Sequence, residues 1–481
     1  MNTYLFYDIE TTGLNRAFDQ VLSFSSIRTD LSFNELENHT IDIRLRPDVI
    51  PSPGAMIVNR IDLPTLLTGH SELSAITEIH RLFNRPGTIS LGYNTLGFDD
   101  EFLRFSFYRN LLSPYTHQFQ HDCSRMDIFP ITLLYFLFKP EGLQWPEKEG
   151  KPSLKLENLN SANHLAHGPD HDAMVDTAAT LALARRLSRH EKMWEYVTGY
   201  FDKKTDGKRI DTLPVSFQSP AGPHRLGLMV DGGFGTDALF LAPVLSIGQS
   251  IPYGNQTLWL RLDLPELQNT TADTFDETTA VIRKKLGEPA IVLPPLNRYW
   301  KRLDSDRQSV AEENQKWLQA NESLLMGIIR YHREYRYPDV PNVDPDAALY
   351  DIGFMSKRDE EICRQFHAAD IKEKIHLIER LTAPVYQELA RRLMGRNFPD
   401  AVSGKLSRQF NRFLKQIHPS SDGDALVDYR GQRRTTPTTA LKEIESLREE
   451  TKKGDIRLDA AQKKILAGLE RYLQDRFFDS D

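Results

Sequence analysis

Strand-like and helix-like segments alternate through the first 185 residues, and this alternation limits the possible folds more than any other feature. The short apolar runs TYLFYDI, QVLSFSSIRT and TISLGYN predict strands. Helical periodicity follows in Glu72–Phe83, after a capping serine at Ser71, and again in Asp172–His190. Strands interleaved with helices predict an α/β domain over residues 1–185.

The rest of the chain divides into two regions of different character. Residues 192–345 contain short strands broken by Gly and Pro, such as HRLGLMVDGGFGTDALFLAPVLSIG and TLWLRLDL, which indicate a small β-barrel or sandwich. Two helices are expected inside this region, in ETTAVIRKKLG and in DRQSVAEENQKWLQANESLLMGIIRYH, while DGGFG is typical of a hairpin turn. The proline-rich stretch YRYPDVPNVDPDAALYD predicts a linker, and residues 348–481 show almost only helical pattern.

Composition excludes several classes of protein. The formal charge of −7 argues against a protein that coats DNA non-specifically, since such proteins are usually basic. No apolar run approaches the ~18–20 residues that a membrane span needs. The two cysteines, Cys123 and Cys363, are too few for a disulfide framework or a zinc site, and with no signal peptide in MNTYLFYDIE we expect a cytoplasmic protein.

Two acidic residues end the first predicted strand. Asp8 and Glu10 share one face of that strand, because side chains alternate with a period of two and Ile9 points the other way. An acidic pair at a strand end is usually just solvated. The TTGL turn that follows, however, contains a glycine that lets a ligand approach the backbone closely.

Two further segments carry acids and a histidine. In GYNTLGFDDEF, Asp99 stands where a helix begins, and either it or Asp100 is expected to serve as the N-cap. In GPDHDAMVDTA, His171 and Asp176 lie about 140° apart on an ideal helix, so we place His171 in the loop and Asp176 in the first turns.

These acids together favour metal-dependent phosphodiester chemistry. Buried carboxylates repel one another unless cations neutralise them, and ligand sets made only of oxygen select Mg²⁺ or Mn²⁺. Two such ions are a recurrent device for the attack of water on a phosphodiester, with a histidine as the base that activates the water.

The motifs DIETTGL, NTLGFD and HDAMVD resemble the three motifs of the DEDDh superfamily of 3′→5′ exonucleases. The chain is also similar, over nearly its full length, to the bacterial exonuclease I family. The segments that carry this similarity are GYNTLGFDDEFLRFSFYRN, PEGLQWPE, HDAMVDTAATLALA, VDPDAALYDIGF and GRNFPD. The resemblance implies a ribonuclease-H-like exonuclease domain (1–185), an SH3-like β-barrel domain (192–345) and an all-helical C-terminal domain (348–481) that closes a C-shaped groove. It also implies Mg²⁺-dependent removal of 5′-mononucleotides from the 3′ end of single-stranded DNA, in DNA repair and recombination.

The resemblance assigns roles to individual residues. It implies that Asp8, Glu10, Asp99 and Asp176 hold two Mg²⁺ ions, with Mn²⁺ as an acceptable substitute, and that His171 is the general base. Glu10 would also contact the terminal nucleotide.

A second group of residues falls at positions that resemble DNA contacts. Arg104, Tyr115 and Phe119 belong to this group, and the aromatic rings would stack on bases. Lys155 replaces an arginine of the family and keeps its charge but not its two-pronged geometry. Leu133 replaces another arginine, and we expect the DNA interaction of that arginine to be missing here.

Two basic segments are candidates for the path of the DNA strand. Val385–Lys415 contains seven basic residues against two acids, together with three phenylalanines. The stretch from RKKLG to NRYWKRL contains six basic residues against Glu288, although it is equally consistent with a solvated surface.

Other functions remain open at this point. An exonuclease that trims RNA ends or proofreads for a polymerase would need only the first domain, and a scaffold that only binds single strands would not need the acids. The family resemblance further implies a monomer that docks on the acidic, Phe-ended tail of the bacterial single-stranded-DNA-binding protein. Such a tail calls for an apolar pocket with a cationic rim.

Overall fold

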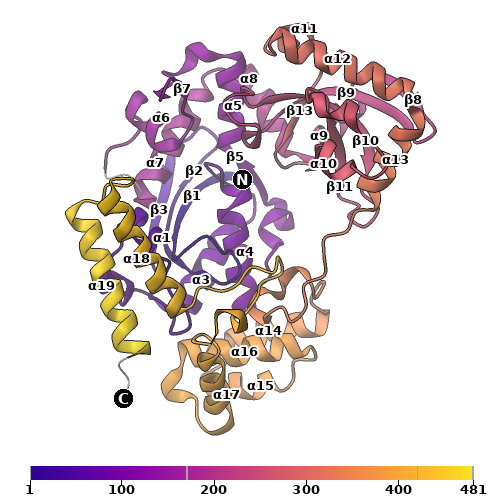
Figure 1. The fold of residues 1–481 in the computed structure, drawn as a ribbon. Coiled ribbons are helices and arrows are strands. Elements are labelled where there is room, and N and C mark those ends of the chain that lie inside the picture. Colours follow the sequence, from indigo (N-terminus) through magenta and orange to yellow (C-terminus); the bar gives the residue numbers. More distant parts are fainter. Residues whose placement is uncertain (1, 169–171, 420, 479–481) are drawn as a thin grey trace.

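The first region is built on a mixed five-stranded sheet, drawn at the centre of Figure 1. The computed structural model describes residues 2–168, 172–419 and 421–478. The strand order is β3-β2-β1-β4-β5; β1 runs antiparallel to β2 and parallel to β4, and β4 runs parallel to β5. The strands are β1 (Thr3–Thr11), β2 (Val21–Thr29), β3 (Glu35–Asp42), β4 (Thr88–Gly92) and β5 (Ser124–Asp127).

Helices cover both faces of this sheet, which confirms the predicted α/β fold. The odd-numbered side chains of β1, such as Tyr7 and Ile9, pack against α3 and α4, whereas Phe6 packs on the other face with α5 and α7. The expected helix Glu72–Phe83 is present with those bounds, and the Ser71 hydroxyl accepts the Ser74 N–H at 3.3 Å. The helices are α1 (Pro53–Asn59), α2 (Leu63–Leu66), α3 (Glu72–Phe83), α4 (Asp99–Arg109), α5 (Ile128–Phe138), α6 (Leu156–Asn163) and α7 (Ala173–Leu187), with a short β6–β7 hairpin (Glu147–Lys148, Lys151–Pro152) between α5 and α6.

The second region opens with two helices and continues as an antiparallel sheet, at the upper right of Figure 1. Pairing runs in the order β12-β11-β10-β9-β13, with β8 also on β9; within the described residues no pair joins β12 to β13. The expected hairpin turn at DGGFG is confirmed, since it connects the antiparallel strands β9 and β10. The elements are α8 (Glu191–Thr198), α9 (Lys203–Asp211), β8 (Val215–Ser219), β9 (Gly222–Val230), β10 (Leu241–Gln249), β11 (Gln256–Arg261), α10 (Phe275–Thr278), β12 (Val281–Lys285), β13 (Ile291–Leu293), α11 (Asn297–Trp300), α12 (Ser305–Ala320) and α13 (Glu322–Glu334).

Two helix predictions in this region need correction. The centre of ETTAVIRKKLG forms the strand β12 and not a helix. Lys284 of this strand points inward and forms a fully buried ion pair with Asp206 at 2.8 Å, a contact that the local sequence pattern does not reveal. The long helix predicted to follow is two helices divided at Asn321. The Asn321 side chain bonds back to the Trp317 carbonyl at 2.8 Å, a local competition with the helix that asparagine often provides.

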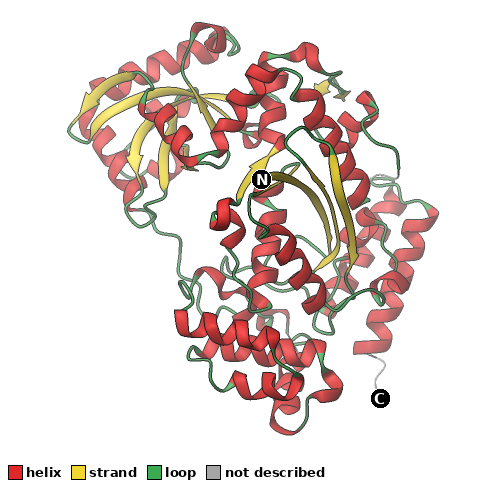
Figure 2. Ribbon diagram, turned by 180° about the vertical axis from the view of Figure 1, so that it is seen from behind, coloured by secondary structure: helices red, strands yellow, loops and turns green. Residues whose placement is uncertain are grey.

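The C-terminal region is helical, as predicted. Helices α14–α17 lie together below the first region in Figure 1, while α18 and α19 run beside α1 and share a core with it. The same arrangement appears from behind in Figure 2. The helices are α14 (Lys357–Ala368), α15 (Ile371–Ile378), α16 (Pro384–Asn397), α17 (Gly404–Lys415), α18 (Pro437–Lys453) and α19 (Ala460–Phe477). In the part of the chain described here, no helix combines the length and apolar character that crossing a bilayer requires.

The second half of the predicted linker is a buried structural element. Asp344 and Asp346, at a short 3₁₀ turn (Pro345–Tyr350), are almost fully buried and form ion pairs with Arg392. Arg396 bonds to Asp346 and also to Asp48 of the first region at 2.8 Å. Proline content alone suggested a solvated linker, but these ion pairs dock the segment between two regions.

Candidate active site

Three carboxylates converge between β1 and α7. Asp8 and Glu10 lie on the face of β1 that is turned towards α7, and Asp176 sits in the first turn of that helix. One carboxylate oxygen from each of the three residues lies within 4.8 Å of the others. The period-two argument from the sequence therefore matches the geometry for this pair of strand residues.

Asp99 approaches this group of three from a different element, near enough for its charge to act on Asp8 and Glu10. It stands in the first turn of α4, is 7% exposed, and has the backbone of Ile9 as a hydrogen-bond partner. The expectation that Asp99 or Asp100 caps this helix is wrong: the N-cap position is Phe98, and the two acids are the first and second residues of the helix. Asp100 instead pairs with Arg104, and with Arg125 at 2.6 Å, which leaves Asp99 available to face the cluster.

Mutual repulsion perturbs these groups strongly. Burial, followed by the charges of Asp99, Glu10 and Asp176, raises the pKa of Asp8 well above its ordinary value. Burial and the charges of Asp176 and Asp99 raise the pKa of Glu10 to about 8. Carboxylates that resist ionisation in this way form a site whose charge a bound cation would balance.

The predicted base, His171, lies outside the described residues. The chain resumes at Asp172, whose carboxylate caps α7 by accepting the N–H of Met174 at 2.9 Å and of Val175 at 3.2 Å. The helix predicted over Asp172–His190 is thus present as Ala173–Leu187 with an aspartate cap.

The predicted DNA contacts occupy one side of α4 and the segment after it. The Arg104 guanidinium lies 6.0 Å from the centre of the Tyr115 ring, and Phe119 is 69% exposed. Lys155 is exposed at the N-cap position of α6. Leu133 is fully buried in α5. An apolar side chain therefore stands at the position where the sequence resemblance expects an arginine.

One exposed aromatic residue near these positions was not predicted from the sequence, and it follows the predicted linker in the chain. Phe354 is 90% exposed, and its ring centre lies 6.1 Å from that of Tyr115 in an edge-to-face arrangement. Tyr350 lies nearby, where its hydroxyl bonds to Glu101 of α4 at 3.2 Å. The signal was present in VDPDAALYDIGF, but only the fold brings that segment against α4.

The two basic segments are only partly available to a ligand. Of the seven cations in Val385–Lys415, Arg392 and Arg396 are buried in ion pairs, and Arg391 faces Glu379 and Glu388. The exposed set lies on α17 and consists of Lys405, Arg408, Arg412 and Lys415. In the second segment, Lys284 is the buried partner of Asp206.

Comparison with known proteins places the chain in a family. Residues 5–184 match the family model described as "Exonuclease", and residues 343–476 match "Exonuclease I C-terminal domain". The exodeoxyribonuclease I of Escherichia coli K12 is 31% identical over 379 residues, covering 74% of this chain and 78% of the relative. That of Haemophilus influenzae is 34% identical over 214 residues, covering 44% and 45% of the two chains.

Solved structures agree over the full length. E. coli exonuclease I in complex with a dA16 oligonucleotide superposes with a TM-score of 0.83 at 24% identity, covering 99% of this chain and 100% of the other. A moderately thermophilic exonuclease I from Methylocaldum szegediense gives 0.81 at 26% identity, covering 99% of each chain. With the sequence match to the E. coli relative, these findings show that the chain belongs to the exonuclease I family.

Proposed function

We propose that this protein is an exodeoxyribonuclease I, a Mg²⁺-dependent enzyme that removes 5′-mononucleotides from the 3′ end of single-stranded DNA. The observation that carries the proposal is the convergence of Asp8, Glu10 and Asp176, with Asp99 beside them, in a chain of the exonuclease I family. A half-buried set of oxygen ligands without sulfur or nitrogen fits Mg²⁺ or Mn²⁺ better than zinc.

The four acids would hold two ions, which in their bound form supply charge stabilisation for the developing phosphodiester transition state. Asp8 and Glu10 would be held in place by the rigid strand β1, and Asp176 by the first turn of α7. Glu10 would also contact the terminal nucleotide. We assign His171 the role of general base, supported by the HDAMVD motif in which it precedes Asp176 by five residues.

The DNA strand would leave the metal site along α4. Asp99 lies at the start of this helix and Arg104 five residues later, about 7.5 Å further along the axis at 1.5 Å per residue. Phe119 and Phe354 expose aromatic faces on which bases could stack, at ~1–3 kcal/mol per base, and we assign the half-buried Tyr115, whose ring lies beside Phe354, to the same group. Lys155 would add a cationic contact to the phosphates.

We further propose three domains, with bounds 1–185, 192–345 and 348–481, and an SH3-like barrel as the second. The helical region and the barrel would enclose a groove that admits a flexible single strand. A duplex would have to be unpaired first, at ~1.4 kcal/mol of stacking per base-pair step.

A partner follows from the relatives. One of the similar solved structures is a crystal structure of SSB/Exonuclease I in complex with the inhibitor CFAM. We propose that this chain likewise binds the acidic tail of a single-stranded-DNA-binding protein. Titration with a tail peptide at low and high salt tests this proposal, and the absence of salt-sensitive binding would remove it.

The direct test of the activity is digestion of a 5′-labelled single-stranded oligonucleotide with Mg²⁺, alongside duplex and RNA of the same sequence. We expect products shortened from the 3′ end and released deoxynucleoside 5′-monophosphates, with both abolished by EDTA. Faster digestion of RNA would favour the RNA-trimming alternative, and binding without digestion would favour a scaffold.

A further inference from the structure

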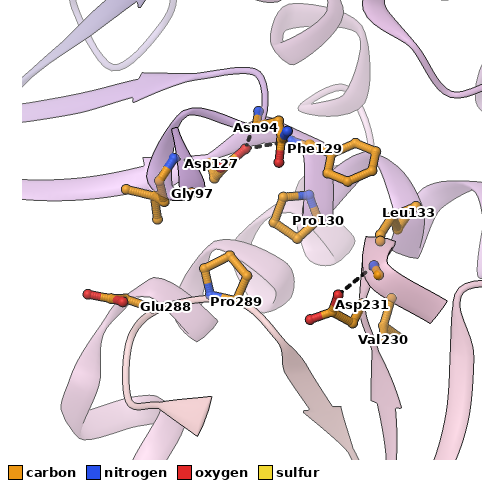
Figure 3. A pocket seen from close by; sticks show the side chains of 13 residues that line it. Asn94, Gly97, Asp127, Phe129, Pro130, Leu133, Val230, Asp231, Glu288 and Pro289 are labelled. Atoms are coloured by element: carbon orange, nitrogen blue, oxygen red, sulfur yellow. Dashed lines mark hydrogen bonds between the residues drawn. The ribbon is translucent and has the colours of Figure 1, made fainter. Parts of the chain in front are cut away.

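One more acidic residue, a buried aspartate, lies close to the acidic cluster but points into the neighbouring loop. Asp127, at the end of β5, is 1% exposed. Its carboxylate accepts three backbone N–H groups: those of Asn94 at 2.8 Å and Phe129 at 2.9 Å on Oδ1, and that of Leu96 at 3.1 Å on Oδ2. Figure 3 shows this side chain reaching towards Asn94.

Only one of these bonds is accounted for by helix capping. The bond from Phe129 caps the start of α5, an ordinary role for an aspartate. The other two cross to the loop that joins β4 to α4, so they connect two parallel strands of the sheet at the edge where their carboxyl ends meet. A helix cap has no need of these two bonds.

The bonded loop is the one that carries Asp99. Asn94 adopts a left-handed conformation (φ 63°, ψ 27°), Thr95–Gly97 form a 3₁₀ turn, and Asp99 follows directly after Phe98. A non-glycine residue in the left-handed region is held there at an energetic cost, so surrounding contacts must fix it. The Asp127 carboxylate supplies such a contact to the N–H of Asn94 itself.

Packing on the outer side of this loop is incomplete. A cavity of about 460 Å³ borders Asn94, Leu96 and Gly97 and separates them from the β9–β10 turn and Pro289 of the second region. A loop with few apolar contacts on one side depends on its hydrogen bonds for its position. The two bonds to Asp127 restrain this loop from the side of the sheet, and the Arg16 guanidinium adds a bond to the Gly97 carbonyl at 2.7 Å.

We propose that Asp127 is a positioning residue: through Asn94 and Leu96 it sets where Asp99 stands relative to Asp8, Glu10 and Asp176. The inference rests on the proposed function, because it assumes that Asp99 serves as a metal ligand. The three other carboxylates come from β1 and α7, whereas Asp99 is the first residue of α4, directly after this loop, so the position of the loop affects how Asp99 joins them.

The test compares Asp127→Asn and Asp127→Ala with the wild type. Asparagine can keep its carbonyl oxygen on Asn94 and Phe129, but its amide group then meets the Leu96 N–H donor-to-donor; alanine removes all three bonds. Loss of a residue that orients a metal ligand typically costs 10–100-fold in metal affinity. We therefore expect a Mn²⁺ dissociation constant, measured by electron paramagnetic resonance, that rises about 10–100-fold in Asp127→Ala and less in Asp127→Asn.

Two further measurements separate positioning from general damage. Affinity for single-stranded DNA in EDTA should stay within about twofold of the wild type, because Asp127 is not among the residues that we assign to DNA contacts. Asp231→Asn is the matched control: Asp231 lines the same cavity and accepts the Gly233 N–H at 2.7 Å, but it belongs to the β9–β10 turn, so its Mn²⁺ affinity should be unchanged.

Unchanged Mn²⁺ affinity in Asp127→Ala would overturn the proposal. So would equal losses of metal and DNA affinity together with no recovery in Asp127→Asn, since that pattern means a purely structural role. Because these readouts do not use turnover, they remain informative if the wild type fails to digest DNA, a result that would instead refute the proposed function.

Discussion

At the residue scale, the acidic cluster lowers the stability of the metal-free folded protein, because its carboxylates are held close together where a metal ion could bind. Asp8, Glu10 and Asp99 are held in positions where burial and mutual repulsion raise the pKa of each. The strand period predicted that Asp8 and Glu10 share a face, because that depends only on local geometry. The role inferred for Asp127 could not be predicted from sequence, since its partners Asn94 and Leu96 come from another strand's loop.

The raised pKa values predict that the folded protein becomes more stable when one of these acids is replaced by a neutral residue. A raised pKa means that the folded state holds its proton more tightly than the unfolded state, so stability falls as pH rises from about 4.3 towards the Glu10 pKa of about 8. In metal-free protein, Glu10→Gln should therefore raise Tm at pH 8 and leave it nearly unchanged at pH 4, with each kcal/mol worth about 2–4 °C. Thermal unfolding in EDTA measures this, and an equal Tm change at both pH values would contradict it.

The same variant should lose function where it gains stability. Glu10→Gln, like Asp8→Asn, removes a proposed metal ligand, so turnover should fall by orders of magnitude while DNA affinity in EDTA is kept. The added Mg²⁺ that raises Tm of the wild type at pH 8 should have a smaller effect on the variant. Near-normal turnover at saturating Mg²⁺ would remove the residue from the site.

His171 leads to a separate prediction. His171→Ala should retain metal affinity and lose about 10²–10⁴-fold in rate, the usual contribution of a general base. The wild-type pH–rate profile should show a limb near neutrality that the variant lacks. If that limb persists in the variant, another group supplies it and His171 has a different role.

At the element scale, helix period identified α14–α19 but not which of their charges face water. α16 and α17 are both basic in sequence, yet Arg392 and Arg396 of α16 are buried partners of aspartates. α17 differs because Phe410 and Phe413 occupy its inner face and leave its cations outside. Whether a charged side chain is buried depends on a partner that is distant in the sequence. The same reason applies to the strand β12, which was not predicted because Lys284 is buried against the distant Asp206.

The exposed face of α17 should contribute to DNA binding through charge alone. Its four cations, spaced at 405, 408, 412 and 415, form one stripe, and no ion pair involves them within the described ranges. Changing all four to serine should weaken binding to a long single strand at low salt. It should also reduce the salt slope, by about 0.7 for each phosphate that the variant no longer neutralises. Fluorescence titration across salt concentrations measures both quantities.

A matched control uses four exposed lysines on the last two helices. Lys452, Lys453, Lys463 and Lys464 carry the same total charge on α18 and α19, so their replacement by serine tests for a non-specific effect of net charge. If both sets reduce the salt slope equally, α17 is not a specific part of the DNA path.

At the scale of the whole molecule, a buried ion network fastens the helical region to the first one. Asp48, from the loop before α1, bonds to Arg396 and Arg434, and Arg396 continues to Asp346, which also bonds to Arg392. The sequence around Asp346 predicts a linker, because none of the charged partners of Asp346 lies near it in the chain. The network therefore explains both the misassigned linker and the reduced basic surface of α16.

Breaking the network should release the helical region selectively. Removing one partner of a buried ion pair typically costs about 3–5 kcal/mol, because the remaining charges stay buried without compensation. Asp346→Ala removes one carboxylate partner from each of Arg392 and Arg396, which keep Asp344 and Asp48, so we expect the lower end of that range. The variant should have a lower Tm and expose the segment around 335–343 to proteases. The arginines hold the pKa of Asp346 well below its usual range, so its contribution is complete at neutral pH and is lost only as pH falls through that depressed value. The wild-type advantage should hence persist at pH 5.

Release of the helical region also bears on how far the enzyme travels on one strand. If that region and the second region together enclose the DNA, Asp346→Ala should shorten the run of nucleotides removed per encounter while sparing cleavage of short oligonucleotides, since Asp8, Glu10, Asp99 and Asp176 all lie within residues 1–185. The measurement is product length against time with an excess of unlabelled DNA as a trap, at a temperature where both proteins are folded. The α17 serine variant provides the contrast: it should weaken initial binding in a salt-dependent way, whereas Asp346→Ala should shorten runs even at low salt. Equal run lengths for Asp346→Ala and wild type would mean that docking of the helical region does not hold the strand, and the enclosing groove would have to be abandoned as the cause of processive digestion.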